Sequence, residues 1–183
     1  MRADLERDGV RFRSQSDTEV LLAAFARHGT ACLSKLNGIF AFAVWDRDTR
    51  TLTLARDHLG VKPLYYRWDG KRLMFSSEIK GILVHRDVAR QIDPESLNLY
   101  MRFLYVPGPR TMFAGIRKLQ PGHALTVRTG EMKLTPFWEI KEGQSLPDGE
   151  IMDAVRSGVV GAVHRQLVSD RPLGVFLSGG IDS

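Results

Sequence analysis

The chain has 183 residues, more than most single domains and fewer than two domains of ordinary size, so we expect one domain plus part of another. Hydrophobic residues make up 43% and charged residues 26%, a balance that allows a buried core and argues against disorder. The net charge is +5, but the basic side chains are scattered among carboxylates and form no basic arm. We therefore expect no nucleic-acid partner.

Cys32 is the only cysteine, so no internal disulfide can form and the reducing cytoplasm is the expected compartment. Its apolar neighbours indicate a small core residue rather than a reactive one. Residues 1–12 have neither the apolar core of a signal peptide nor an acid-poor transit pattern. No apolar stretch is long enough to cross a membrane, so we expect a soluble cytoplasmic protein without a membrane partner.

The first strong helix signal begins at Ser16. Ser16 and Glu19 have the spacing of a capping box, and apolar residues follow on one helical side. Gly29 supplies the stop, so the sequence predicts a helix from about Ser16 to Gly29. Residues 2–7 also resemble a helix.

Three β-hairpins are predicted from paired apolar runs with polar or glycine-containing turns between them. Asp69-Gly70 is the strongest of these turn signals. The first run is apolar at almost every position, which predicts burial on both faces. The paired runs are 39–45 with 51–55, 63–68 with 72–76, and 124–127 with 132–135.

Between and after the hairpins, further helices are expected. Residues 78–85 indicate a short one, and Asp93 as N-cap with Pro94 in the first turn opens another that reaches Tyr105. Two glycines and a proline make 141–149 the best candidate for a linker. An apolar helical stripe then runs from Ile151 to Leu167.

The last eleven residues combine a predicted strand, Leu173–Leu177, with the loop Ser178–Ser183. Loops at the carboxyl ends of parallel strands are where α/β folds bind ligands, and two glycines let backbone N–H groups approach phosphate. Asp182 would repel phosphate unless Mg²⁺ lies between them. The glycines alone favour an ordinary turn, whereas the whole hexapeptide after an apolar strand favours a phosphate site. No Walker A loop or Gly-x-Gly-x-x-Gly is present.

This loop resembles the pyrophosphate-binding motif of N-type ATP pyrophosphatases, which cleave ATP between the α and β phosphates. Upstream segments resemble the glutaminase domain of asparagine synthetases, in the family's order. Together they cover nearly the whole chain. The segments that resemble the glutaminase domain are 11–21, 36–43, 55–66 and 75–80.

The resemblance implies a layered α+β fold: an N-terminal-nucleophile (αββα) glutaminase-like domain, incomplete, at 1–140, a linker at 141–149, and the first helix and strand of an α/β ATP pyrophosphatase domain at 150–183. It implies asparagine synthesis from aspartate, glutamine and ATP through β-aspartyl-AMP, with ammonia from glutamine hydrolysis. Mg²⁺ accompanies ATP, and a homodimer of the full-length protein is left open.

By the same resemblance, Asp17 binds the α-amino group of glutamine, a charge-assisted contact. Without the neighbouring motif, Asp17 would be read as a helix-opening acidic residue. A second set is implied to bind ATP, with Asp182 also holding Mg²⁺: Leu177, Ser178, Gly179, Gly180, Asp182 and Ser183. A third set also matches family positions, and for it we expect architectural rather than catalytic roles: Arg56, Asp57, Gly60 and Pro63.

The family's nucleophile is a cysteine at the mature N-terminus, whereas position 2 here is Arg2, so no catalytic residue is assigned. We expect the chain to be a fragment that lacks parts of both active sites and is inactive alone. Two alternatives stay open. One is a related ATP-dependent amide ligase, such as a β-lactam synthetase-like or peptide-tailoring amidotransferase, and the other is a non-catalytic remnant.

Overall fold

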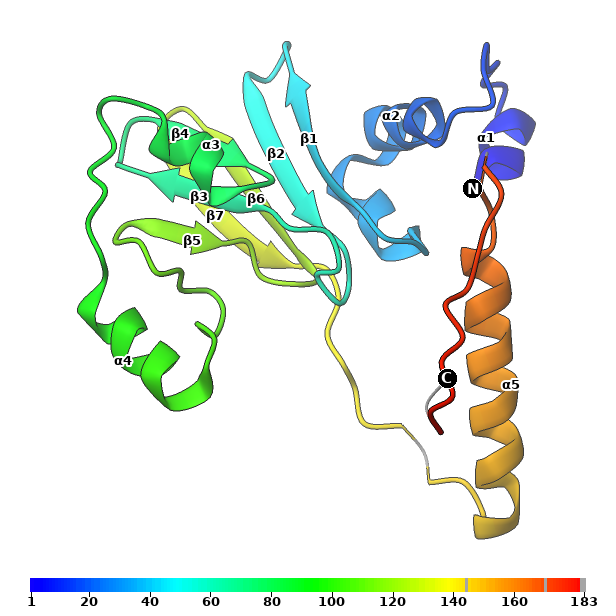
Figure 1. Cartoon of the computed structure of the whole chain (residues 1–183). Coiled ribbons are helices and arrows are strands. Elements are labelled where there is room, and N and C mark those ends of the chain that lie inside the picture. The colour runs from blue at the N-terminus through cyan, green and yellow to red at the C-terminus, as the bar shows by residue number, and fades with distance from the viewer. Residues whose placement is uncertain (144, 170, 182–183) are drawn as a thin grey trace. The chain divides into compact units, whose positions relative to one another are not determined.

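A computed structural model describes residues 1–143, 145–169 and 171–181. The chain divides into two compact units, Met1–Ile140 and Lys141–Ser183. Figure 1 shows the helices and strands of both units.

The first unit contains two antiparallel sheets. One has the strand order β1-β2-β6-β7 and the other the order β4-β3-β5. The first sheet consists of β1 (Ala41–Asp46), β2 (Thr51–Arg56), β6 (His123–Arg128) and β7 (Glu131–Pro136). The second consists of β3 (Tyr65–Trp68), β4 (Leu73–Ser76) and β5 (Ile116–Lys118).

All three predicted hairpins are confirmed, as β1-β2, β3-β4 and β6-β7. The sequence did not predict β5, which pairs with β3. This strand has three residues, two of them charged, so it shows no alternation for a sequence pattern to detect.

The prediction that the first strand is buried on both faces is wrong. Strand β1 begins at Ala41, and its Ala43 and Trp45 side chains are exposed, Trp45 by 55%. Among the strands that the structure describes, β1 pairs only with β2 and forms an edge of the sheet. The central strand β2 instead supplies fully buried residues, including Leu54 and Ala55.

Helices surround the sheets. They are α1 (Arg2–Arg7), α2 (Asp17–His28), α3 (Ile79–Leu83) and α4 (Pro94–Phe103), with a 3₁₀ segment η1 (Gly29–Lys35) directly after α2. Asp93 is the N-cap of α4, as predicted, but the helix ends at Phe103 because Leu104 adopts a left-handed conformation with φ of 60°. The 3₁₀ segment was not predicted.

The N-cap of α2 is also confirmed, since the Ser16 hydroxyl accepts a hydrogen bond from the Thr18 amide. The reciprocal half of the predicted capping box is wrong. The Glu19 carboxylate does not reach the Ser16 amide and instead accepts from the Arg13 and Ser14 amides at 2.9 and 2.8 Å. The amides of Arg13 and Ser14 therefore bind this carboxylate in place of the Ser16 amide.

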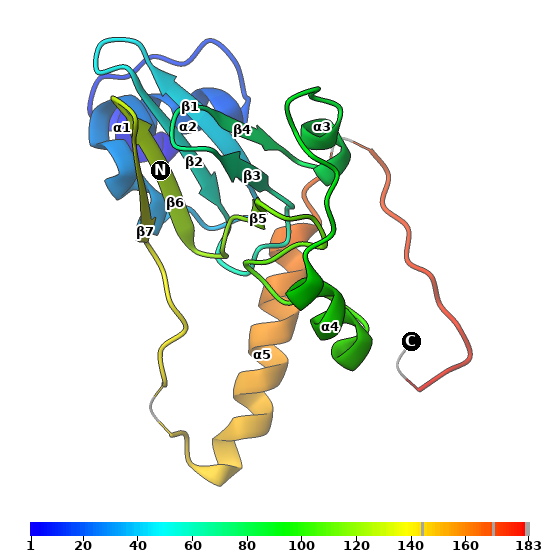
Figure 2. The same ribbon diagram turned by 90° about the vertical axis from the view of Figure 1, so that its left-hand side faces the viewer.

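The layers follow from side-chain alternation along the strands. On β2, Ala55 packs into a cluster with helical residues such as Ala24, whereas the preceding Leu54 packs into a cluster shared with the second sheet. On β3, Tyr66 joins this inter-sheet cluster and Tyr65 packs against the cluster that contains Ile82 of α3. Successive residues of a strand point to opposite faces, so the order is helices, sheet, sheet, helix (Figures 1 and 2).

This αββα layering confirms the expected fold class for the first unit. Cys32 is fully buried in the helix-side cluster, as its apolar neighbours indicated. Burial raises the pKa of its thiol, so a smaller fraction of Cys32 is in the reactive thiolate form.

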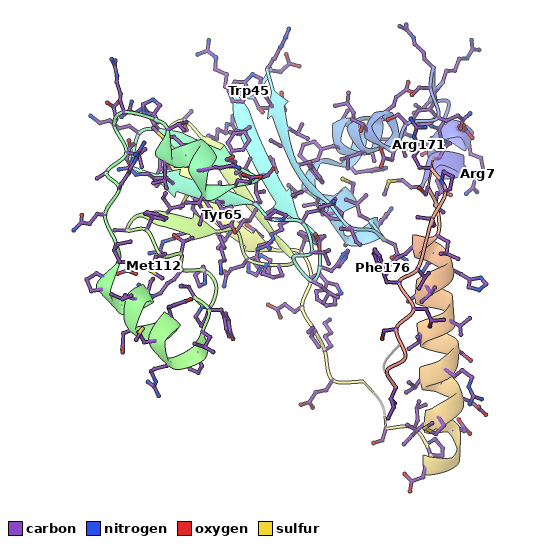
Figure 3. All side chains as sticks on the ribbon, in the orientation of Figure 1. Arg7, Trp45, Tyr65, Met112, Arg171 and Phe176 are labelled. Carbon is purple, nitrogen blue, oxygen red and sulfur yellow. The ribbon has the colours of Figure 1, made fainter. Side chains whose placement is uncertain are left out.

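The second unit contains α5 (Asp148–Gln166), which confirms the helix predicted from the apolar stripe between Ile151 and Leu167. The predicted strand Leu173–Leu177 is wrong, because these residues are irregular. A strand requires a neighbouring strand for its ladder hydrogen bonds, and the described part of this unit contains none. Phe176 is fully exposed, and Figure 3 shows its side chain on this irregular segment.

Candidate glutamine-binding pocket

A pocket of about 830 Å³ opens in the first unit. Most of its lining comes from three stretches of chain: the start of α2 with the loop before it, the residues that lead into β1, and the turn that precedes β3. Met1, Arg2 and Ser77 complete the lining. Asp17 and Thr18 belong to the first stretch, Asn37 and Gly38 to the second, and Lys62 with Pro63 to the third. All four segments that resemble a glutaminase domain therefore contribute to one cavity, the last of them through Ser77.

Asp17 is the first residue of α2 and lies in the pocket lining. Its carboxylate accepts a hydrogen bond from the Thr18 hydroxyl at 3.3 Å. Among the residues that the structure describes, no lysine, arginine or histidine nitrogen lies within the 4.0 Å of an ion pair with it. The carboxylate therefore keeps acceptor capacity toward the pocket, where a ligand ammonium group is a suitable partner.

The loop before α2 is held from two sides. The Arg2 guanidinium stacks 4.4 Å from the centre of the Phe12 ring and donates to the Ser14 carbonyl oxygen at 2.8 Å. From the helix, the Glu19 carboxylate accepts from the Ser14 hydroxyl at 2.6 Å as well as from two amides. The Ser14 hydroxyl and the amides of Arg13 and Ser14 hold the pKa of Glu19 below its usual value. These contacts fix the backbone that leads to Asp17.

The turn that supplies Lys62 and Pro63 is organised by Arg56 and Asp57. The Arg56 guanidinium donates to carbonyl oxygens of Lys62, Leu119 and Gly60 at 2.7, 2.7 and 2.6 Å. The Asp57 carboxylate, 2% exposed, accepts from three amides of the same turn. These bonds agree with the architectural roles expected for both residues.

The ionisation of this pair follows its surroundings. Burial acts to raise the pKa of Asp57, but the surrounding backbone N–H groups outweigh it and leave the pKa below the usual value. Burial lowers the pKa of Arg56, although the neighbouring Asp57 charge opposes this. Asp57 is ionised at neutral pH because its pKa is lowered, and an arginine guanidinium stays protonated in proteins at that pH.

Sequence patterns did not single out His58, which lies in an aromatic cluster. Its ring makes edge contacts with Phe40, Phe137 and Trp138, at centroid distances of 6.2, 5.5 and 5.2 Å. Phe40 also lines the pocket. The cluster joins the pocket lining to the end of the first unit, and only the pairing of strands distant in sequence brings these rings together.

The predicted ATP loop lies in the second unit and is described only in part. Leu177, Gly179 and Gly180 are exposed, and the Ser178 hydroxyl accepts from the Gly180 amide at 3.3 Å. Asp182 and Ser183 lie outside the described residues. The carboxylate of Asp182 is the oxygen ligand that Mg²⁺ prefers, and its assignment stays a prediction.

Among the residues that the structure describes, no group of three or more histidine, cysteine, aspartate or glutamate side chains is arranged to hold a metal ion. In the same residues, no helix is both long and apolar enough to cross a membrane.

Comparison with solved structures defines the class of fold. The glutamine phosphoribosylpyrophosphate amidotransferase from B. subtilis, complexed with ADP and GMP, is similar with a TM-score of 0.52 and 23% identity. The match covers 75% of this chain and 26% of that structure. The first unit thus has the fold of N-terminal-nucleophile amidotransferases.

Family models give the particular family. Residues 1–138 match the glutamine amidotransferase domain, and residues 154–183 match asparagine synthase. The chain belongs to the glutamine amidotransferase domain family. The resemblance seen in the sequence is confirmed.

Curated relatives agree with these matches. The glutamine-hydrolyzing asparagine synthetase 3 of Bacillus subtilis (strain 168) is 41% identical over all of this chain and 30% of its own length. Amidase chry2 of Gibberella zeae is 34% identical over 96% of this chain and 26% of its own length. The chain therefore spans less than a third of the length of these two relatives.

Proposed function

We propose that this chain is the glutamine-binding part of a glutamine-hydrolysing asparagine synthetase, together with the start of its synthetase domain. The complete protein would make asparagine from aspartate, glutamine and ATP through β-aspartyl-AMP, using ammonia released from glutamine. The observation that supports this most is the Asp17 pocket in an amidotransferase fold, followed in the same chain by a match to asparagine synthase.

In this proposal Asp17 binds the α-ammonium group of glutamine. The carboxylate lies in the pocket without a cationic partner among the described residues, and a charge-assisted hydrogen bond to ammonium would satisfy it. Such a contact favours glutamine with a free α-amino group, because acylation of that nitrogen in a peptide bond removes its positive charge.

The second unit would bind ATP. Backbone amides of the loop from Leu177 to Gly180 would approach phosphate, and Asp182 would hold the accompanying Mg²⁺. We also propose a cytoplasmic location, without nucleic-acid or membrane partners, and a homodimer of the complete protein. Analytical ultracentrifugation of that protein would measure the last of these.

The test uses the complete protein that contains this chain. Asparagine formation is measured with glutamine and, separately, with ammonia as the nitrogen donor. Asp17→Asn is expected to raise the KM for glutamine about 10- to 100-fold, as expected for the loss of a hydrogen bond between charged groups, and to leave the ammonia-dependent rate unchanged. Asp48→Asn, an exposed turn residue outside the pocket, is the matched control. An unchanged KM in Asp17→Asn would remove Asp17 from the site.

A related amide ligase is the second candidate, since the chain is 34% identical to a fungal protein named as an amidase. Pyrophosphate release separates the two. The asparagine synthetase proposal predicts release that depends on aspartate, whereas the alternative predicts none with aspartate and release with another carboxylic acid.

A further inference from the structure

One residue of the pocket lining, Lys62, has both of its backbone polar groups bound by neighbouring charged side chains. Its carbonyl oxygen accepts from Arg56 Nε at 2.7 Å, and its amide donates to Asp57 Oδ2 at 2.9 Å. Arg56 and Asp57 are adjacent at the end of β2, so the rigid sheet fixes where this residue lies.

The other hydrogen bonds of Arg56 and Asp57 hold the rest of the turn. Arg56 also donates to the carbonyl oxygens of Gly60 and Leu119, and the other Asp57 oxygen accepts from the amides of Leu59 and Val61. Because Asp57 is almost completely buried, loss of its carboxylate would leave amides without an equivalent acceptor.

Packing restricts the turn further at Gly60. Its φ is +68°, and a Cβ atom there would lie 2.8 Å from Pro121 Cγ and 2.9 Å from Arg56 Cζ. The turn therefore lies directly against the guanidinium group. A shift of Arg56 would move the backbone of the turn with it.

We propose that Arg56 and Asp57 are positioning residues for the glutamine pocket. They do not line the pocket, and they act by holding the backbone of Lys62 and Pro63, which do. This inference rests on the proposed function in one respect, the identity of glutamine as the ligand. Displacement of a binding group by about 1 Å is enough to change a rate or affinity by orders of magnitude.

The experiment compares Asp57→Asn and Arg56→Lys in the complete protein, below the melting temperature of each variant. Both are expected to raise the KM for glutamine about tenfold and to leave ammonia-dependent activity unchanged. Leu59→Ala is the matched control. It lies in the same turn, its side chain is 68% exposed and outside the pocket, and its amide is retained.

A purely structural role predicts a lower melting temperature with an unchanged KM, and that result would overturn the proposal. Hydrogen exchange of the turn gives a readout that does not depend on glutamine. The Lys62 amide is expected to exchange faster in Asp57→Asn and at the normal rate in Leu59→Ala. Continued protection of this amide in Asp57→Asn would also overturn the positioning role, whereas a lack of glutamine-dependent activity in the unaltered protein would overturn only the proposed function.

Discussion

The carbonyl oxygen of Trp138 lies so close to Gly122 that a Cβ atom on the glycine would be 2.5 Å from it. The two residues also share a hydrogen bond, from the Trp138 amide to the Gly122 carbonyl oxygen at 3.2 Å. Gly122 has a φ of +66°, and its own amide donates to the Asp57 carbonyl oxygen at 2.9 Å. This glycine thus joins the turn beside the pocket to the segment that leaves the first unit.

Gly122→Ala is expected to destabilise the first unit by about 3 kcal/mol, since a side chain there adds a backbone clash to the cost of a positive φ. Gly130→Ala is the matched control. It has a φ of +83° but no atom within 4 Å of its Cβ position, so it isolates the conformational cost of about 1 kcal/mol. Urea unfolding measures both. Equal losses of unfolding free energy in the two variants would show that Trp138 moves away from the added methyl group without a cost in stability.

Acidification should reveal the contribution of Asp57. Its pKa is lower in the folded chain than its ordinary value of 3.8, so the carboxylate stabilises the fold above that value, and the contribution is lost as the pH falls through the folded pKa. Asp57→Asn is expected to cost about 1–3 kcal/mol at pH 7. Unfolding measured from pH 7 downward should show the difference between the two proteins constant at first and smaller below pH 3.8. A constant difference throughout would contradict this assignment.

Glu19→Gln tests the loop that leads to Asp17. The amide oxygen of glutamine can replace only part of the three hydrogen bonds that Glu19 accepts from Arg13 and Ser14. We expect faster hydrogen exchange at these two amides and a higher KM for glutamine in the complete protein. Glu131→Gln, at an exposed carboxylate on β7, should change neither. Unchanged exchange in Glu19→Gln would show that Arg2 alone holds the loop.

The same substitution at two helical glycines should have opposite signs. Gly158→Ala in α5 meets open space and should stabilise the helix by about 0.5–1 kcal/mol, because alanine loses less backbone entropy. Gly81→Ala in α3 would place its Cβ against the hydroxyl of Ser76, with the Ser76 Cβ atom at 3.0 Å, and should destabilise the first unit. Circular dichroism during thermal unfolding measures both. If Gly81→Ala instead stabilised the first unit, the Ser76 side chain would have to rotate away from the added methyl group without a cost in stability.

Sequence patterns predicted correctly the elements that depend on a few neighbouring residues. Asp69-Gly70 supplied the residues that a tight turn requires, and Ser16 supplied an N-cap, so the hairpin and the helix formed as expected. The strand predicted at Leu173–Leu177 failed for the opposite reason. Apolar residues favour a strand, but a strand forms only beside a partner, which no pattern within five residues can supply.

By itself, the sequence determined the order of helices and hairpins, the family resemblance and the identity of Asp17 as a site candidate, because these depend on residue types at short spacing. Only the tertiary structure decided which strand lies at the sheet edge, that Glu19 turns to Arg13 and Ser14, and that Lys62 lies in the same pocket lining as Asp17. Those outcomes depend on contacts between residues that chain folding brings together. Competition among such contacts determines how deeply a strand is buried, which groups a side chain bonds and where a residue lies.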